Sequence, residues 1–235
     1  MSATASRPRG ILAVDTATAQ GSVALVEPGA PPRVIALGAR DHGRSLAPAV
    51  QALVEGRWSR VEGYAIAIGP GSFTGLRVGL SFLKGLALAE PRPLAPVSTL
   101  ALLARAARAD AAHRAELDGG APLLAALDAR NGEVFARLDD DEVGLVRIDA
   151  LAARAARPGV IVGDPIPALD AALSAWRRAP APRLLAGVLA AWAAASPDAG
   201  ADAVRWTDGL QDLEPTYGQG AAVDRRLAEA GRPSS

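Results

Sequence analysis

The feature that most constrains the fold is a strand pattern that occurs twice. Leu12-Ala13-Val14-Asp15-Thr16 is an apolar run that ends in an aspartate, and Ala125-Ala126-Leu127-Asp128-Ala129 repeats it in the second half. A polar turn and a second strand-like segment follow each run, so each half begins with a β-hairpin. Repetition of such a unit predicts two related α/β domains in one chain. Two unrelated α/β domains with similar first strands are the alternative.

The first half has the order βββαβαβα. Its expected strands are residues 11–15, 22–26, 33–37, 64–68 and 94–97, and its expected helices are residues 46–55, 74–89 and 99–109. We expect Ser45 to cap the first helix, with Pro48 tolerated in the first turn.

The second half begins in the same way and is shorter in its regular elements. Its expected strands are residues 123–128, 133–138, 143–148 and 160–162, and its expected helices are residues 150–156, 168–178 and 183–195. The duplicated pattern predicts an α/β protein with the actin-like fold of Hsp70, actin and sugar kinases, two βββαβα domains of which the second is reduced. We expect an N-terminal domain over residues 1–112 and a smaller one over residues 113–235.

Composition excludes several kinds of site. The chain has 235 residues and no cysteine, so disulfides, thiolate zinc sites and a cysteine nucleophile are ruled out. The 25 basic and 25 acidic residues balance, which gives no overall attraction to nucleic acid or anionic lipid. The longest uncharged apolar stretch, residues 184–195, is shorter than a membrane span. We therefore expect a cytoplasmic protein with no membrane contact.

The most distinctive segment is Gly69-Pro70-Gly71-Ser72-Phe73-Thr74-Gly75-Leu76-Arg77, between a predicted strand and a predicted helix. A phosphate-binding loop would occupy this place. The segment nevertheless fails the Walker A, dinucleotide and nucleophile-elbow templates, because it lacks the lysine and the glycines that they require. A tight turn with a serine or threonine helix cap is the first interpretation. A bound anion and a contact with a partner protein are the others.

The helix after this segment carries small residues on one face. Ser72, Gly75 and Gly79 follow the i, i+3, i+7 spacing and lead on to Phe82. Glycine inside a helix costs about 1 kcal/mol relative to alanine, so close approach of a second backbone would explain it. That backbone could belong to this chain or, as a sharper hypothesis, to another one.

Polar residues in the two turns and the two histidines are further candidates. Asp15 and Asp128 end the first strands of the two halves, and in an actin-like fold such a pair could hold magnesium and phosphates. The turns then include Thr16, Thr18 and Arg130. His42 and His113 show no metal-ligand spacing, so we expect solvated or hydrogen-bonded side chains.

Together these segments resemble the TsaB (YeaZ) family. The resemblance is carried by residues 11–18, 69–79, 84–87, 97–100 and 127–134, and the block Gly69 to Arg77 is highly specific to that family. It is close over residues 11–103 and 127–137 and loose over residues 138–205. Near the C-terminus the family tends to finish on Pro-x-Tyr-x-Arg, whereas Pro215-Thr216-Tyr217-Gly218-Gln219 has glutamine in place of the arginine.

The resemblance implies a non-catalytic subunit in the synthesis of N6-threonylcarbamoyladenosine at position 37 of tRNAs that read codons starting with A. Its implied partners are the transferase TsaD, an actin-like paralogue, and the ATPase TsaE, with tRNA reached through the complex; no cofactor or metal is implied. The transferase carries paired metal-ligand histidines that this chain lacks. The interface residues expected from the helix are Ser72, Phe73, Gly75, Leu76, Arg77, Gly79 and Phe82, and Asp15, Thr16, Thr18, Asp128 and Arg130 would form vestigial phosphate turns.

Two other functions stay open on the sequence. An ATP-dependent kinase of the actin-like superfamily would need a second phosphate loop and an adenosine-binding glycine cluster, for which Gly163-Asp164-Pro165 is a poor substitute. A glycoprotease-type hydrolase would need a metal site or a nucleophile, and Ser45 and Ser72 are its candidates. The interface expected on the helix of residues 74–89 could also pair two copies of this chain, because a two-fold contact uses the same surface patch on both copies.

Overall fold

A computed structural model describes residues 8–38, 41–180, 184–195, 203–208 and 213–216 of the chain. The chain folds into two compact units. Unit 1 comprises Met1–Ile68, Ser72–Ser98 and Arg183–Pro215, and unit 2 comprises Gly69–Gly71, Thr99–Pro182 and Thr216–Ser235. The expected boundary between an N-terminal domain (residues 1–112) and a C-terminal domain (residues 113–235) stays a prediction.

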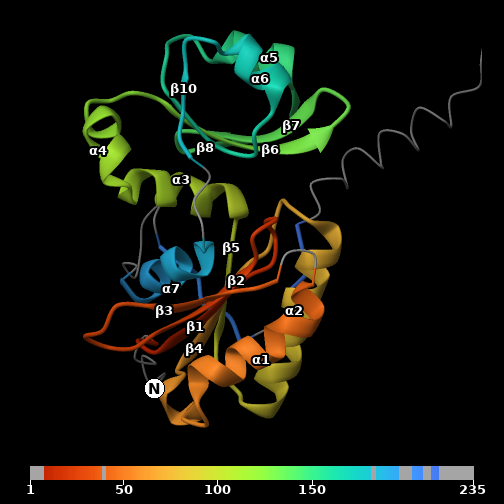
Figure 1. The fold of residues 1–235 in the computed structure, drawn as a ribbon, viewed down its shortest axis with the longest axis vertical. Coiled ribbons are helices and arrows are strands. Elements are labelled where there is room, and N and C mark those ends of the chain that lie inside the picture. The colour runs from red at the N-terminus through yellow and green to blue at the C-terminus, as the bar shows by residue number, and fades with distance from the viewer. Residues whose placement is uncertain (1–7, 39–40, 181–183, 196–202, 209–212, 217–235) are drawn as a thin grey trace, which may run out of the picture. The chain divides into compact units, whose positions relative to one another are not determined.

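Unit 1 is a five-stranded sheet with helices on both faces (Figure 1). Its strands are β1 (Ile11–Asp15), β2 (Ser22–Val26), β3 (Arg33–Ala36), β4 (Gly63–Ala67) and β5 (Leu94–Val97), and its helices are α1 (His42–Val54), η1 (Trp58–Arg60), α2 (Phe73–Ala89) and α7 (Leu185–Ala195). The strand order is β3-β2-β1-β4-β5. The first three strands are antiparallel neighbours, whereas β4 and β5 run parallel to β1.

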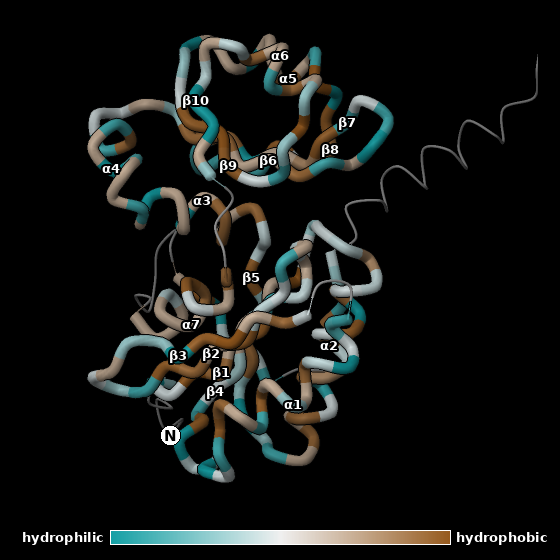
Figure 2. The backbone as a smooth tube through the Cα atoms, in the orientation of Figure 1, coloured by the Kyte–Doolittle hydropathy of each residue, from teal (hydrophilic) through white to brown (hydrophobic). Residues whose placement is uncertain are grey.

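The core of unit 1 follows from the alternation of side chains along its strands. Leu12, Val14, Tyr64 and Ile66 belong to a buried apolar cluster that includes the inner faces of α1 and α2. The residues between them, such as Ala13, alternate onto the opposite face, where α7 packs on β1 and β2. All five residues of β1, β2 and β4 are buried, and Figure 2 shows these strands as mostly apolar.

Unit 2 repeats this sheet. Its elements are α3 (Thr99–Ala109), α4 (Ala111–Asp118), β6 (Leu123–Arg130), β7 (Glu133–Leu138), β8 (Asp141–Arg147), α5 (Ile148–Arg154), β9 (Val160–Gly163), α6 (Pro167–Ala172) and β10 (Arg177–Arg178). The order β10-β9-β6-β7-β8 has the same antiparallel and parallel pairings as unit 1. Helices α5 and α6 contribute to the core on one face, and α3 packs on β6, β7 and β9. The predicted fold class is confirmed.

Several element boundaries differ from the prediction for local reasons. Helix α1 begins at His42 rather than residue 46, so Ser45 is no cap and Pro48 lies inside the helix. The Ser45 hydroxyl instead donates to the Asp41 carbonyl, over 2.8 Å. Helix α4 was not expected, although Asp110 caps it by accepting from the amide of Ala112.

In the second half, α6 ends at residue 172, and the chain then forms the short strand β10 instead of a longer helix. Helix α7 follows the second half in sequence but completes unit 1. Its first turn is held by β2, where the Ser22 hydroxyl accepts a 3.1 Å hydrogen bond from the Ala186 amide. Among the described residues, no helix is both long and apolar enough to span a bilayer.

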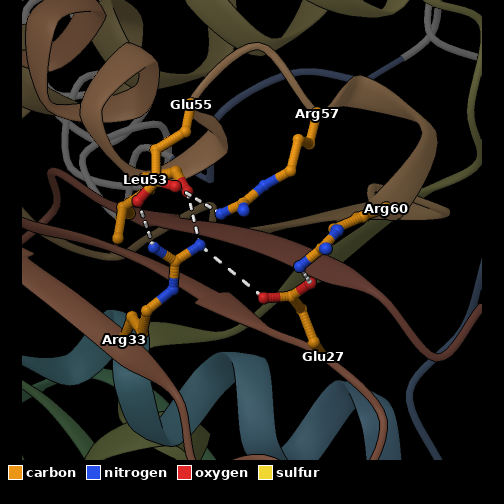
Figure 3. A network of polar contacts seen from close by, with 6 residues as sticks. All are labelled: Glu27, Arg33, Leu53, Glu55, Arg57 and Arg60. Atoms are coloured by element: carbon orange, nitrogen blue, oxygen red, sulfur yellow. Dashed lines mark hydrogen bonds and ion pairs between the residues drawn. The ribbon is translucent and has the colours of Figure 1, made fainter.

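A polar network joins the β2–β3 hairpin to the end of α1 (Figure 3). Arg33 on β3 donates to the Glu55 carboxylate over 2.8 Å and to the Leu53 carbonyl over 2.6 Å. Glu27 accepts from Arg60 over 2.8 Å and lies 3.6 Å from Arg33. Because the Arg33 and Glu55 side chains are 39% and 49% exposed, we expect a modest contribution to stability.

Candidate functional site

The glycine-rich segment before α2 forms a turn and a helix cap. Ser72 is the N-cap residue of α2, and its hydroxyl accepts a hydrogen bond from the Gly75 amide over 3.2 Å. Gly69 has a φ of 116°, a left-handed conformation that favours glycine. These observations confirm the first interpretation of the segment, a tight turn followed by a cap.

The small residues of α2 face the interior of unit 1. An ideal Cβ at Gly75 would lie 1.9 Å from the Thr16 carbonyl oxygen, and one at Gly79 would lie 2.3 Å from the Thr16 hydroxyl oxygen. That hydroxyl donates to the Gly75 carbonyl over 2.7 Å, and the Ser72 amide donates to the Ala17 carbonyl over 2.8 Å. The second backbone that the glycines admit is therefore the turn after β1, in the same chain.

This packing changes what the expected interface can contain. Gly75, Leu76 and Gly79 are buried within the chain, so this structure does not present them to a partner. Phe73 is 50% exposed, and Phe82 is half-buried and packs against the core of unit 1. Ser72 and Arg77 are exposed beside them. The partner interface stays a prediction, and of the residues expected in it only the exposed and half-buried ones, Ser72, Phe73, Arg77 and Phe82, can contact a partner in this structure.

The turn after β1 uses its own aspartate. The Asp15 carboxylate accepts from the Ala17 amide over 2.9 Å and from the Thr18 hydroxyl over 2.6 Å. Asp15 is fully buried, and this burial raises the pKa of its carboxyl, which the hydrogen bonds and the nearby His42 oppose. Both carboxylate oxygens are thus hydrogen-bonded within the turn, and the N-terminus of α2 packs directly on it.

The matching turn in unit 2 is more open. Arg130 donates its amide to the Asp128 carboxylate over 2.8 Å, and the Asp128 amide donates to the Asp164 carboxylate over 3.0 Å. Arg130, Asn131 and Gly132 all have positive φ, which forms the tight connection between β6 and β7. Asp15 ends β1, whereas Asp128 lies two residues before the end of β6, and each carboxylate accepts a hydrogen bond from an amide two residues further along the chain.

The two histidines differ from the expectation of solvated or hydrogen-bonded rings. His113 is 4% exposed in α4, and neither ring nitrogen has a hydrogen-bond partner. His42 is half-buried against Gly21, and its Nε2 is buried without a partner. Within the described part of the chain, no group of three or more histidine, aspartate or glutamate side chains could hold a metal ion.

The outward face of α1 and α2 is the other notable surface. Among the described residues, Phe73 and Leu88 are the exposed large apolar side chains, and both lie on α2, with Leu88 80% exposed. Helix α2 packs beside α1 on the same face of the sheet (Figure 1). The positions that we call the α2 stripe, residues 73, 77, 81, 84 and 88, follow helical spacing along one side. Phe73 and Leu88 lie near the two ends of α2, so a partner that contacts this helix along its length would cover both.

Two contacts of unit 1, the packing of Thr16 on α2 and the Ser22 hydrogen bond to α7, have no signal in the sequence. The spacing of Ser72, Gly75 and Gly79 indicated a close approach but not that Thr16 makes it. The Ser22 cap joins residues 164 positions apart. From Tyr217 onward, the segment that departs from the family's C-terminal motif lies outside the described residues.

Comparisons with known proteins match the chain to TsaB proteins and to the family model of the transferase TsaD. The family model for TsaD, tRNA N6-adenosine threonylcarbamoyltransferase, matches residues 29–175, more than half of the chain. The tRNA threonylcarbamoyladenosine biosynthesis protein TsaB of Escherichia coli (strain K12) is 38% identical over 139 residues, which cover 57% of each chain. The TsaB of Haemophilus influenzae (strain ATCC 51907 / DSM 11121 / KW20 / Rd) is 35% identical over 128 residues, covering 53% of this chain and 51% of the relative.

These matches leave part of each relative uncovered. The chain spans about half the length of the curated relatives it matches. A crystal structure from Pseudomonas aeruginosa, described as an uncharacterized protein with similarity to peptidase YEAZ, aligns over more of the fold. It has a TM-score of 0.64 and 26% sequence identity, and the alignment covers 88% of this chain and 98% of that one.

Proposed function

Since the chain belongs to the TsaB (YeaZ) family within the TsaD family, we propose that it is a non-catalytic subunit for tRNA threonylcarbamoyladenosine synthesis. In this role it supports threonylcarbamoyl transfer to N6 of adenosine 37, in tRNAs that read codons starting with A, by binding the transferase TsaD. The ATPase TsaE joins the assembly, and tRNA is reached through the complex. This role implies a cytoplasmic location.

The exposed apolar part of α2 is the observation that carries the proposal. Phe73 and Leu88 are exposed large side chains on a helix that begins in the family-specific block. Leaving such side chains in water is unfavourable, and burying both against a partner would contribute a few kcal/mol, about 2 kcal/mol for each fully buried side chain. A partner that docks along α2 would cover both of them.

The Asp15 turn supports the non-catalytic part of the proposal. Its carboxylate is fully buried, and the turn's own amide and hydroxyl groups bind both carboxylate oxygens. An actin-like ATPase would need that carboxylate for magnesium and phosphate. Ser45 and Ser72, the candidate nucleophiles of a hydrolase, bond to backbone groups at the starts of α1 and α2. These contacts favour a helper over a kinase or a glycoprotease.

Reconstitution tests the role directly. The cognate transferase, the adenylate-forming enzyme, the ATPase and unmodified tRNA are combined with and without this chain, and modified adenosine is measured by mass spectrometry. We expect omission to abolish or sharply lower modification. Unchanged modification without the chain would refute the proposed role.

The helper and the enzyme are separated by two further measurements. Asp15→Asn should keep the modification rate of the complete system if the variant folds, because no reacting group contacts Asp15 in a helper. Micromolar, magnesium-dependent ATP binding in calorimetry, with turnover by the chain alone, would instead support the kinase.

The docking surface is tested by co-purification with the transferase. The double variant Phe73→Ser, Leu88→Ser should fold, because both side chains are exposed, yet lose most of its transferase. The double variant Ala171→Ser, Ala172→Ser, at exposed positions of α6 in unit 2, is the control and should co-purify normally. Normal binding by the double variant would place the interface elsewhere.

A further inference from the structure

The two sheets have four edge strands, and β5 (Leu94–Val97) is the one without a charged residue. The other three carry charged residues, namely Arg33 on β3, Asp141, Glu142 and Arg147 on β8, and Arg177 and Arg178 on β10. An edge strand presents unpaired backbone groups to which a strand of another chain can bond, and charged side chains are a common protection. The apolar strand β5 therefore needs a different protection.

The register of β5 leaves two of its residues directed away from β4. The amides of β4 and of the residue after it bond to the carbonyls of Pro93 and Val97, each over 2.9 Å. Because alternate residues of a strand bond to opposite neighbours, Leu94 and Pro96 face outward. Proline has no amide hydrogen, so the Leu94 amide is the one outward donor of β5.

A segment from the end of the described chain covers this donor. The Leu94 amide donates to the Thr207 carbonyl, and the Thr207 amide donates to the Leu94 carbonyl, each over 2.9 Å, in an antiparallel bridge. Residues 203–208, which we call the strap, belong to unit 1, and Val204 within it is 8% exposed. Both outward groups of Leu94 are thus bonded to a part of the same chain that is distant in sequence.

Trp206 anchors the strap against the start of β4. An ideal Cβ at Gly63 would lie 2.6 Å from Cζ3 of Trp206 and 2.9 Å from Cβ of Pro8, so the indole ring occupies space that a larger residue at 63 would fill. The indole nitrogen is buried without a hydrogen-bond partner, so the ring is held by apolar contact. The strap therefore combines a backbone bridge with an aromatic anchor.

We propose that the strap guards the β5 edge: by bonding to Leu94, it prevents this strand from pairing with β5 of a second copy of the chain. In an antiparallel two-fold pair, residue 94 of one copy lies opposite residue 96 of the other. Pro96 is the second part of the guard, because without an amide it cannot return the hydrogen bond that such a pair exchanges. Loss of both protections should therefore favour pairing more than the two single losses together.

Release of the strap is measured at the Leu94 amide by hydrogen exchange in NMR spectra. Thr207→Pro removes the amide that donates to Leu94 and places the proline ring against the Leu94 carbonyl, so exchange should become at least about tenfold faster. Thr207→Val keeps the amide and the branched side chain, and as the matched control it should leave the exchange rate unchanged. Trp206→Ala should act like Thr207→Pro, through loss of the anchor. The Tyr64 amide, bonded to Pro93, should stay protected throughout because the sheet stays folded.

Self-association is measured by sedimentation velocity. Pro96→Val should behave as the wild type, because the strap still covers Leu94. The double variant Pro96→Val, Thr207→Pro should associate at least about tenfold more tightly than either single variant, and its Leu94 amide should regain protection as protein concentration rises. Pro96→Lys, Thr207→Pro also restores an amide at position 96 but adds a charge to the edge, so this control should associate no more than the wild type.

The outcomes decide between a guard and a merely structural segment. Leu94 exchange that is unchanged in both Thr207→Pro and Trp206→Ala would show that the strap does not cover the edge. Faster exchange without tighter association of the valine double variant, or with equal association of the lysine control, would overturn the guard. If Thr207→Pro does not fold, Pro96→Val, Trp206→Ala takes its place with the same outcomes. All of these measurements use this chain alone, so their result is separate from that of the proposed function.

Discussion

Gly75→Ala tests whether the small residues of α2 are required by packing inside the chain. The new methyl carbon would lie 1.9 Å from the Thr16 carbonyl oxygen, whereas ordinary contacts begin near 3.4 Å. The atom in the way belongs to the backbone, so no side-chain rotation relieves the overlap. The turn after β1 and the first turn of α2 must move apart.

The expected loss of stability combines three contributions. Overpacking of this kind costs about 1–3 kcal/mol. Separation also weakens the hydrogen bonds from the Thr16 hydroxyl to the Gly75 carbonyl and from the Ser72 amide to the Ala17 carbonyl, each worth about 1 kcal/mol. Alanine's helix preference returns up to about 1 kcal/mol. We therefore expect the free energy of unfolding to fall by about 2–4 kcal/mol.

Gly85→Ala in the same helix is the matched control. Gly85 is exposed, and a Cβ built on it would meet nothing within 4 Å. Alanine should therefore raise the free energy of unfolding by up to about 1 kcal/mol. Both variants are measured by urea denaturation followed by circular dichroism. If Gly75→Ala is stabilising like Gly85→Ala, the inward packing of the small residues is refuted.

Three more changes test the contacts that hold unit 1 together. Burial raises the pKa of the Asp15 carboxyl, so this carboxyl keeps its proton to a higher pH in the folded protein than in the unfolded chain. In urea titrations, the free energy of unfolding of the wild type relative to Asp15→Asn should therefore fall between pH 4 and neutral pH. A difference that stays constant or rises would contradict this. Ser22→Ala removes the hydroxyl that caps α7, and we expect a loss of about 1 kcal/mol by thermal unfolding, with no loss if the cap is unimportant. Arg33→Ala removes the arginine at the centre of the network in Figure 3, and chemical denaturation should show a loss of about 1 kcal/mol or less in the free energy of unfolding. A much larger loss would contradict the modest contribution expected of exposed ion pairs.

The sequence predicted most of the regular structure because the local patterns are strong. The runs ending at Asp15 and Asp128 indicated the two hairpin starts, and their repetition indicated the duplicated sheet order. Ser72 and Thr74 were both recognisable cap candidates because hydroxyl side chains stand between a glycine-rich turn and an apolar helix, and the structure has Ser72 as the cap. In each case a few adjacent residues contain the whole signal, so no knowledge of distant contacts is needed.

What the sequence determined alone is therefore most of the order of strands and helices, with α4 and β10 missed, together with the class of fold and the family. Only the tertiary structure decided which face of α2 is buried, because Gly75 and Gly79 would suit a close contact with either a partner or Thr16. Only it assigned α7 to unit 1, since the Ser22 cap joins residues distant in sequence. Propensity and periodicity act between neighbours along the chain, whereas burial and capping across the fold depend on which surfaces meet after it closes.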